Sequence, residues 1–183
     1  MDLNPLISSF KKMKPMIHSD AFIDISARII GAVKVEQGAS IWPMAVLRAD
    51  SAEIIVNSHA AVLDLSLLEA PEGHSVHLED YALVSHGAVV HGARVCSGAL
   101  IGIRAIILER AIISSGSIVG ANSLVTADIM VPPNSLVLGS PGEVVRETAP
   151  FERQRLLDQS EELYQKSLQM IREQIRLNLK PGR

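Results

Sequence analysis

Two histidines stand close together in the segment SHGAVVHG, at positions 86 and 91, and the acidic residue Glu69 precedes them. Neutral imidazole and carboxylate are common ligands of Zn²⁺, and two histidines with one carboxylate hold the catalytic zinc of some metalloproteases. These residue types predict a metal site made of His86, His91 and Glu69. The fold must bring the three side chains together for such a site to exist.

An aliphatic residue recurs at nearly every sixth position, and such a period predicts a repeat architecture. The pattern breaks at 48–55 and at 69–77, and two steps in its last part are five residues long. We predict loops at the two breaks, since insertions in such folds project from a corner. The residues predicted to point inward are Ile23, Ile29, Val35, Ile41, Leu47, Val56, Val62, Leu68, Leu78, Val84, Val90, Val95, Ile101, Ile107, Ile112, Ile118, Leu124, Met130 and Leu136.

This period does not fit a helix, because six residues rotate an α-helix through about 600° and so change its face. Short extended segments separated by bends can keep the period. Aromatic residues make up only 3% of the chain, which suits thin layers of aliphatic side chains. We therefore predict an all-β fold, a three-sided parallel β-helix whose coils stack about 4.8 Å apart. The period does not determine the hand.

The chain divides into three parts. Residues 1–20 lack the pattern and are predicted to form an N-terminal arm, followed by the β-helix domain at 21–147. Within 148–183, apolar residues recur at spacings of three, four, five and seven among charged and polar ones. This spacing predicts a C-terminal amphipathic helix that packs along the prism or against a partner. The apolar residues are Leu156, Leu163, Leu168, Ile171, Ile175 and Leu179.

Residues three strands apart lie above one another on the same face of such a prism. Counting back from Val90 places Arg48, Glu69 and His91 in one column, with about 5 Å between neighbours. The same count places His86 over Asp64. His86 and His91 are separated by roughly 16 Å of extended chain with a corner between them. The two imidazoles can therefore share one metal only across a subunit interface, and threefold symmetry suits a three-sided prism.

Several residues carry a second interpretation. Glu69 can form an ion pair with Arg48 instead of binding a metal, or can do both. His74 and His77 lie in or beside the second predicted loop, either as alternative ligands or as exposed histidines without a metal role. His18 and His59 are predicted at the surface. The lone cysteine is Cys96, a small packing residue with no base placed to activate it.

The composition excludes some partners. The formal net charge of −3 gives no electrostatic reason to expect nucleic acid or an anionic membrane as a partner. No run of the sequence approaches the roughly 20 apolar residues of a membrane helix. The start lacks the apolar core of a secretory signal, and a single cysteine suits a reducing compartment. A cytoplasmic protein is expected.

Five blocks of the sequence resemble, in order, the signature blocks of γ-carbonic anhydrase-like proteins. They are VLRAD (46–50), AVLDLSLLE (61–69), VSHGAVVHGA (84–93), ALIGIRAIILERAII (99–113) and LGSPGEVVR (138–146). The resemblance implies a left-handed β-helix, a homotrimer, and a Zn²⁺, Fe²⁺ or Co²⁺ ion at each subunit interface. It implies that His86 and His91 are ligands and that Arg48, Asp50 and Asp64 link subunits and order the site.

The sequence also departs from the family. Glu69 replaces the third ligand histidine, Leu63 an amide side chain, Ala61 a common asparagine and Val137 an aromatic hydroxyl. The resemblance implies reversible hydration of CO₂, with Glu69 as third ligand or proton acceptor and with Arg48 and Asp64 orienting the groups. Two alternatives stay open: a structural or binding homologue without activity, and an acyltransferase that uses coenzyme A.

Overall fold

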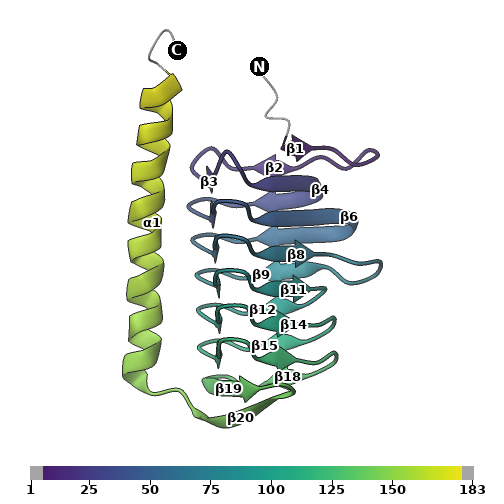
Figure 1. Cartoon of the computed structure of the whole chain (residues 1–183), viewed down its shortest axis with the longest axis vertical. Helices are drawn as coiled ribbons and strands as arrows, with labels where there is room; N and C mark the ends of the chain where they lie inside the picture. Colours follow the sequence, from purple (N-terminus) through teal and green to yellow (C-terminus); the bar gives the residue numbers. More distant parts are fainter. Residues whose placement is uncertain (1–5, 179–183) are drawn as a thin grey trace.

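The computed structural model describes residues 6–178 and shows a three-sided prism with one long helix beside it (Figure 1). The predicted left-handed parallel β-helix with a C-terminal helix is confirmed. The chain runs around the prism through three faces, here called A, B and C. Each strand pairs in parallel with the strand one coil earlier, apart from the last strand, which is antiparallel. Among the described residues, no helix is long and apolar enough to cross a membrane.

The three faces differ in how their strands are connected. Faces A and B share two strands that continue around the corner between them, β4 (Arg28–Val35) and β6 (Val46–Val56). The other strands of face A are β1 (Ile7–Ser8), β8 (Leu67–Glu69), β11 (Val89–His91), β14 (Ile106–Ile107) and β17 (Leu124–Val125). Those of face B are β2 (Met16–Ile17), β9 (Val76–Leu78), β12 (Arg94–Val95), β15 (Ile112–Ile113) and β18 (Met130–Val131). Face C holds β3 (Phe22–Ile23), β5 (Ser40–Ile41), β7 (Ala61–Val62), β10 (Leu83–Val84), β13 (Leu100–Ile101), β16 (Ile118–Val119), β19 (Ser135–Gly139) and β20 (Gly142–Glu147).

The core of the prism is a stack of aliphatic layers, as the six-residue period predicts. The predicted inward positions are correct for Ile29 to Ile107, all of which are buried, and Ile23 packs partly buried against the core. The last five are wrong by one residue, as Met130 shows with 66% of its surface exposed. The step after Ile107 is six residues rather than five. The buried residues are Ile113, Val119, Val125, Val131 and Val137.

The two breaks in the period have different structures. The prediction of a loop at 48–55 is wrong, because β6 continues through it. The pairing steps from Gly31–Ala49 to Val33–Ile54, so the extra residues of β6 widen the corner between faces A and B. The second break does form a loop, at 70–75, which projects from the same corner after β8 (Figure 1).

Most of the segment predicted as an N-terminal arm takes part in the β-helix. β1 pairs with β4 at Ile7–Ile29, and β2 pairs with β4 at Met16–Lys34. The described part of this segment therefore forms one further coil at the start of the prism. Residues 1–5 lie outside the described residues.

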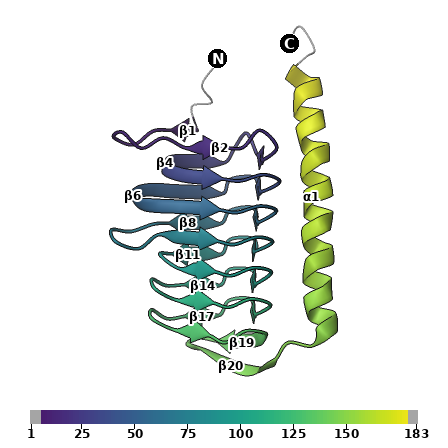
Figure 2. The same ribbon diagram turned by 180° about the vertical axis from the view of Figure 1, so that it is seen from behind.

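The predicted C-terminal helix is α1 (Pro150–Asn178), which runs back along face C from the β19–β20 end to β3 and β5 (Figures 1 and 2). The predicted Leu179 lies outside the described residues. The side of α1 with buried or half-buried residues at spacings of three and four includes Leu156, Ser160, Leu163 and Ser167. The predicted packing along the prism is confirmed.

The start of α1 has a polar cap. Pro150 occupies the first helical position, where no backbone donor is needed. The Glu152 carboxylate accepts a hydrogen bond from the Ala149 backbone N–H at 2.7 Å and pairs with both terminal nitrogens of Arg146 at 2.7 and 2.8 Å. These hydrogen bonds lower the pKa of Glu152 to about 2, with that from Arg146 the largest cause.

We expect Gly31→Ala to destabilise the prism more than the matched change Gly73→Ala. Both glycines have a positive φ, 81° and 78°. A Cβ on Gly31 would lie 2.0 Å from the Ala49 carbonyl oxygen, whereas one on Gly73 would meet nothing within 4 Å. Gly73→Ala should cost about 1 kcal/mol through backbone strain, and Gly31→Ala about 2 kcal/mol or more. Urea unfolding at one protein concentration measures both, and equal costs would contradict the prediction.

We expect the contribution of Glu152 to stability to depend on pH. Because its pKa in the folded chain is depressed from 4.5 to about 2, the stabilisation is complete above about pH 4.5 and is lost as the pH falls towards 2. Glu152→Gln should therefore lower the thermal unfolding temperature most at neutral pH and progressively less below pH 4.5. Glu173→Gln, an exposed position on the same helix, is the control. A pH-independent effect of Glu152→Gln would refute this account.

Candidate metal-binding site

The column predicted on face A is present. Arg48 pairs with Glu69 and Glu69 with His91 in the parallel ladder, so the three side chains point outward one above another. Arg48 Nη2 donates to Glu69 Oε1, and Arg48 Nη1 lies 3.5 Å from Asp50 Oδ2. The His91 Nδ1 atom lies 3.4 Å from Glu69 Oε2. The predicted ion pair between Glu69 and Arg48 is thus confirmed.

His86 lies at the corner between faces C and A, two residues after β10. As the count predicts, it stands over Asp64, with 3.0 Å between His86 Nδ1 and Asp64 Oδ2. The Gly87 backbone N–H donates to the Asp64 carbonyl oxygen at 2.9 Å, and Gly87 has a φ of 66°. This turn leaves the imidazole about half exposed beyond the corner.

The predicted ligands do not come together within one chain. Among the described residues of the single chain, no group of three His, Cys, Asp or Glu side chains is arranged to hold a metal ion. The roles of His86, His91 and Glu69 as ligands therefore stay predictions. The donor types fit zinc, since both histidines have Nδ1 at a carboxylate and the opposite nitrogen, Nε2, remains for a metal.

The alternative ligands lie elsewhere. His74 is in the loop at 70–75, with Nε2 3.2 Å from Nη1 of Arg110, which also forms a bidentate pair with Asp128. His77 points outward from face B, paired with Arg94 in the ladder. His77 therefore lies on a different face of the prism from the column that contains His91.

Neither the two other histidines nor the single cysteine belongs to the column or to the His86 corner. The His18 side chain is exposed, as predicted. His59 is not a simple surface residue: its ring stacks on Tyr81 at 5.1 Å and meets the edge of Tyr164 at 4.6 Å, and its Nδ1 is buried. Sequence spacing could not indicate this contact, because Tyr164 belongs to α1. Burial raises the pKa of the Cys96 thiol, and the charge of a nearby glutamate raises it further, so the thiol is not activated.

α1 forms one wall of a cleft that reaches the His86 corner. The cleft has a volume of about 290 Å³ and its lining includes His86, Asp64, Trp42 and Leu63. Leu63, which stands where the family has an amide, is buried with Ala61 and Leu83 in the apolar layer beneath α1. This departure therefore has a packing role that the sequence alone did not show.

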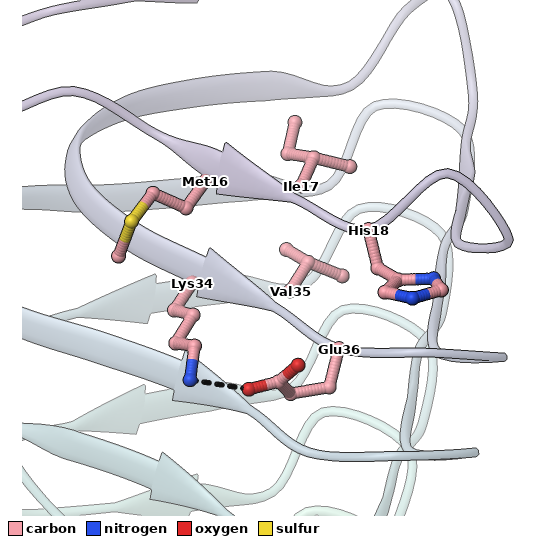
Figure 3. A pocket seen from close by; sticks show the side chains of 6 residues that line it. All are labelled: Met16, Ile17, His18, Lys34, Val35 and Glu36. Carbon is pink, nitrogen blue, oxygen red and sulfur yellow. Dashed lines mark ion pairs between the residues drawn. The ribbon is translucent and has the colours of Figure 1, made fainter.

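A second hollow lies on face B and has no part in this site. Figure 3 shows six side chains of β2, β4 and the residues just after them around a pocket of about 160 Å³. The Lys34 ammonium and the Glu36 carboxylate form an ion pair at 2.5 Å along its rim. The face A column and the His86 corner contribute nothing to its lining.

An apolar stripe runs beside the polar column on face A. It consists of Val46, Leu67, Val89, Ile106 and Leu124, which pair successively across five coils and are half-buried or exposed in the single chain. The corner that carries His86 also exposes large apolar side chains, with 49–73% of each accessible. They are Ile25, Met44, Leu65 and Ile103. Apolar patches of this kind commonly mark protein–protein contacts.

Comparisons with known proteins agree with this architecture. No family model matches the chain. A protein from Methanocaldococcus jannaschii named probable carbonic anhydrase is 47% identical over 132 residues, which are 72% of this chain and 83% of that protein. The carbonic anhydrase of Geobacillus kaustophilus is 36% identical over 142 residues, 78% of each chain.

Solved structures share the fold as well. A putative acetyltransferase from Bacillus cereus superposes with a TM-score of 0.85 and 34% identity, covering 87% of this chain and 92% of that one. This likeness and the two carbonic anhydrase relatives define a β-helical hexapeptide-repeat protein. The chain belongs to the γ-carbonic anhydrase-like family of these proteins.

Proposed function

We propose that the chain forms a homotrimer that binds a metal ion between subunits and catalyses the reversible hydration of CO₂. The observation that carries the proposal is the placement of the two histidines. His91 lies on face A and His86 on the corner before it, and each has its Nδ1 at a carboxylate. His86 of one subunit would meet His91 of the next, with zinc as the expected ion and iron or cobalt as alternatives.

The surface around these histidines supports the trimer. The apolar stripe on face A and the exposed apolar side chains of the His86 corner would cover one another if a neighbouring prism docked corner to face. Burying such surfaces is the main driving force for association. A cyclic arrangement of three prisms uses every face A and every His86 corner once.

The polar residues have distinct roles in this proposal. A bound metal would supply Lewis-acid activation of water at neutral pH. Arg48, held between Asp50 and Glu69, fixes the column beneath His91. Asp64 holds the His86 ring in place. The names of the two carbonic anhydrase relatives support CO₂ and bicarbonate as substrates. A cytoplasmic location stays a prediction.

We expect trimers that mix His86→Ala and His91→Ala subunits to recover metal binding that each variant alone lacks. His86→Ala and His91→Ala should each lose the metal, because each removes one half of every site. In mixed trimers, one interface joins the intact His91 of a His86→Ala subunit to the intact His86 of a His91→Ala subunit. Co-refolding should therefore restore up to one metal ion per mixed trimer. Metal analysis after size-exclusion chromatography measures this.

The control is each variant refolded with itself, which should bind no metal. Mixed trimers without metal would refute a site shared between subunits. A wild-type trimer that binds no metal would favour a structural or binding homologue of the anhydrases.

We expect the metal-loaded trimer to hydrate CO₂ faster than the metal-free His86→Ala/His91→Ala double variant. The double variant keeps the fold, because both side chains lie outside the core. Stopped-flow measurement with a pH indicator gives both rates. Equal rates at full metal occupancy would refute the anhydrase activity.

Acyl transfer from coenzyme A is a second candidate, favoured by the similarity to the putative acetyltransferase of Bacillus cereus. Titration calorimetry of the trimer with acetyl-coenzyme A tests it. Saturable binding together with absent CO₂ hydration would make acyl transfer the better proposal.

A further inference from the structure

Both histidines of the candidate site have the same arrangement. Each imidazole has its Nδ1 atom against a carboxylate of the coil before it, at 3.0 Å for His86 and Asp64 and at 3.4 Å for His91 and Glu69. The ladder pairs His91 with Glu69 directly, so the stacking itself sets this contact. The two pairs lie at different places, one at a corner and one on a face.

This arrangement determines which nitrogen can bind a metal. An ionised carboxylate only accepts hydrogen bonds, so we expect a neutral imidazole beside it to carry its proton on Nδ1. The lone pair is then on Nε2. Metal-binding histidines commonly donate their other N–H to a carboxylate, which fixes the tautomer and the ring orientation. Asp64 and Glu69 therefore prepare both Nε2 atoms as donors.

Each oxygen of Glu69 already has a partner in the single chain. Its Oε1 accepts from Arg48 and its Oε2 faces His91 Nδ1. Arg48 is itself close to Asp50, so the carboxylate belongs to a chain of four groups on face A. A metal bound by Glu69 would be a third partner of a carboxylate that already joins Arg48 to His91.

We propose that Glu69 is a positioning residue and not the third metal ligand. It stands where the family has a ligand histidine. Its carboxylate lies beside Nδ1 of His91, however, as the Asp64 carboxylate lies beside Nδ1 of His86. The metal in each interface would then have two nitrogen ligands from the protein. This inference rests on the proposed function for the metal, whereas the tautomers that it predicts belong to the metal-free protein.

The first test is the tautomer of each histidine in the metal-free trimer. At about pH 9, where free histidine is neutral, ¹⁵N NMR of protein with labelled histidine distinguishes protonated Nδ1 from protonated Nε2. We expect His86 and His91 to carry the proton on Nδ1. Glu69→Ala should change the tautomer of His91 only, and Asp64→Ala that of His86 only. In Glu69→Gln the single carbonyl oxygen accepts from Arg48, so the amide NH₂ faces His91 Nδ1 and should move the proton of His91 to Nε2.

The proposal is wrong if His91 of the wild type carries its proton on Nε2, or if Glu69→Ala leaves its tautomer unchanged. Size-exclusion chromatography and circular dichroism identify any variant that has not folded. If Glu69→Ala does not fold, Glu69→Gln, which keeps the shape of the side chain, tests in the Co²⁺ experiment below whether Glu69 is a ligand.

The second test uses Co²⁺, whose visible absorption reports its ligands. Glu69→Gln should leave the shape of the Co²⁺ band unchanged and weaken binding by roughly 10–100-fold, as Asp64→Asn should. Glu69→His should change the band, because it adds a ligand. Quenching of Trp42, the single tryptophan, measures affinity, since Trp42 and His86 line the same cleft.

A band that changes in Glu69→Gln would show that Glu69 is a ligand and would overturn the proposal. Failure of the wild type to bind Co²⁺ would instead count against the proposed function. In that event the tautomers in the first test still decide the role of Glu69.

Discussion

The rest of the structure depends on the hydrogen-bonded stacking of one coil on the next. Each coil places its inward aliphatic residue over that of the coil before, and its outward residues must then form columns. Arg48, Glu69 and His91 are one such column. The same stacking forms the apolar stripe beside the column, because each coil contributes one outward apolar residue at the same register position. Residues one coil apart in sequence thus become neighbours through the ladder itself.

The candidate site uses this stacking in two ways. On face A the polar column forms directly from the ladder of β6, β8 and β11. At the corner between faces C and A the chain turns at Gly87, and His86 points away from its own face. The two candidate ligand histidines of a single prism therefore face different directions. In both, the ring has its Nδ1 beside a carboxylate of the preceding coil within the same chain.

Much of this could be predicted from the sequence because one inward residue per six is a local rule. The rule failed after Ile107, where adjacent aliphatic pairs such as Ile112–Ile113 and Met130–Val131 offer two candidates for one inward position. Burial selects the second of each pair, and no local pattern reveals burial. The widened corner at 48–55 was predicted as a loop, because extra residues in an extended strand look like a missing repeat. The contact of His59 with Tyr164 joins residues of different elements and could not be foreseen from either. The ligand roles of His86, His91 and Glu69 stay predictions because they involve a second chain.

The path of α1 also bears on how the chain folds. Each coil contacts only its neighbours, so a prism of this kind is a one-dimensional array in which the ends can fray independently of the middle. α1 begins beside the last coil and ends its run against β3 and β5, near the first. Through these contacts between residues far apart in sequence, α1 joins the two ends of the array. We expect it to make the unfolding of the prism more cooperative, and during synthesis the first coils remain without this cover until α1 has been made.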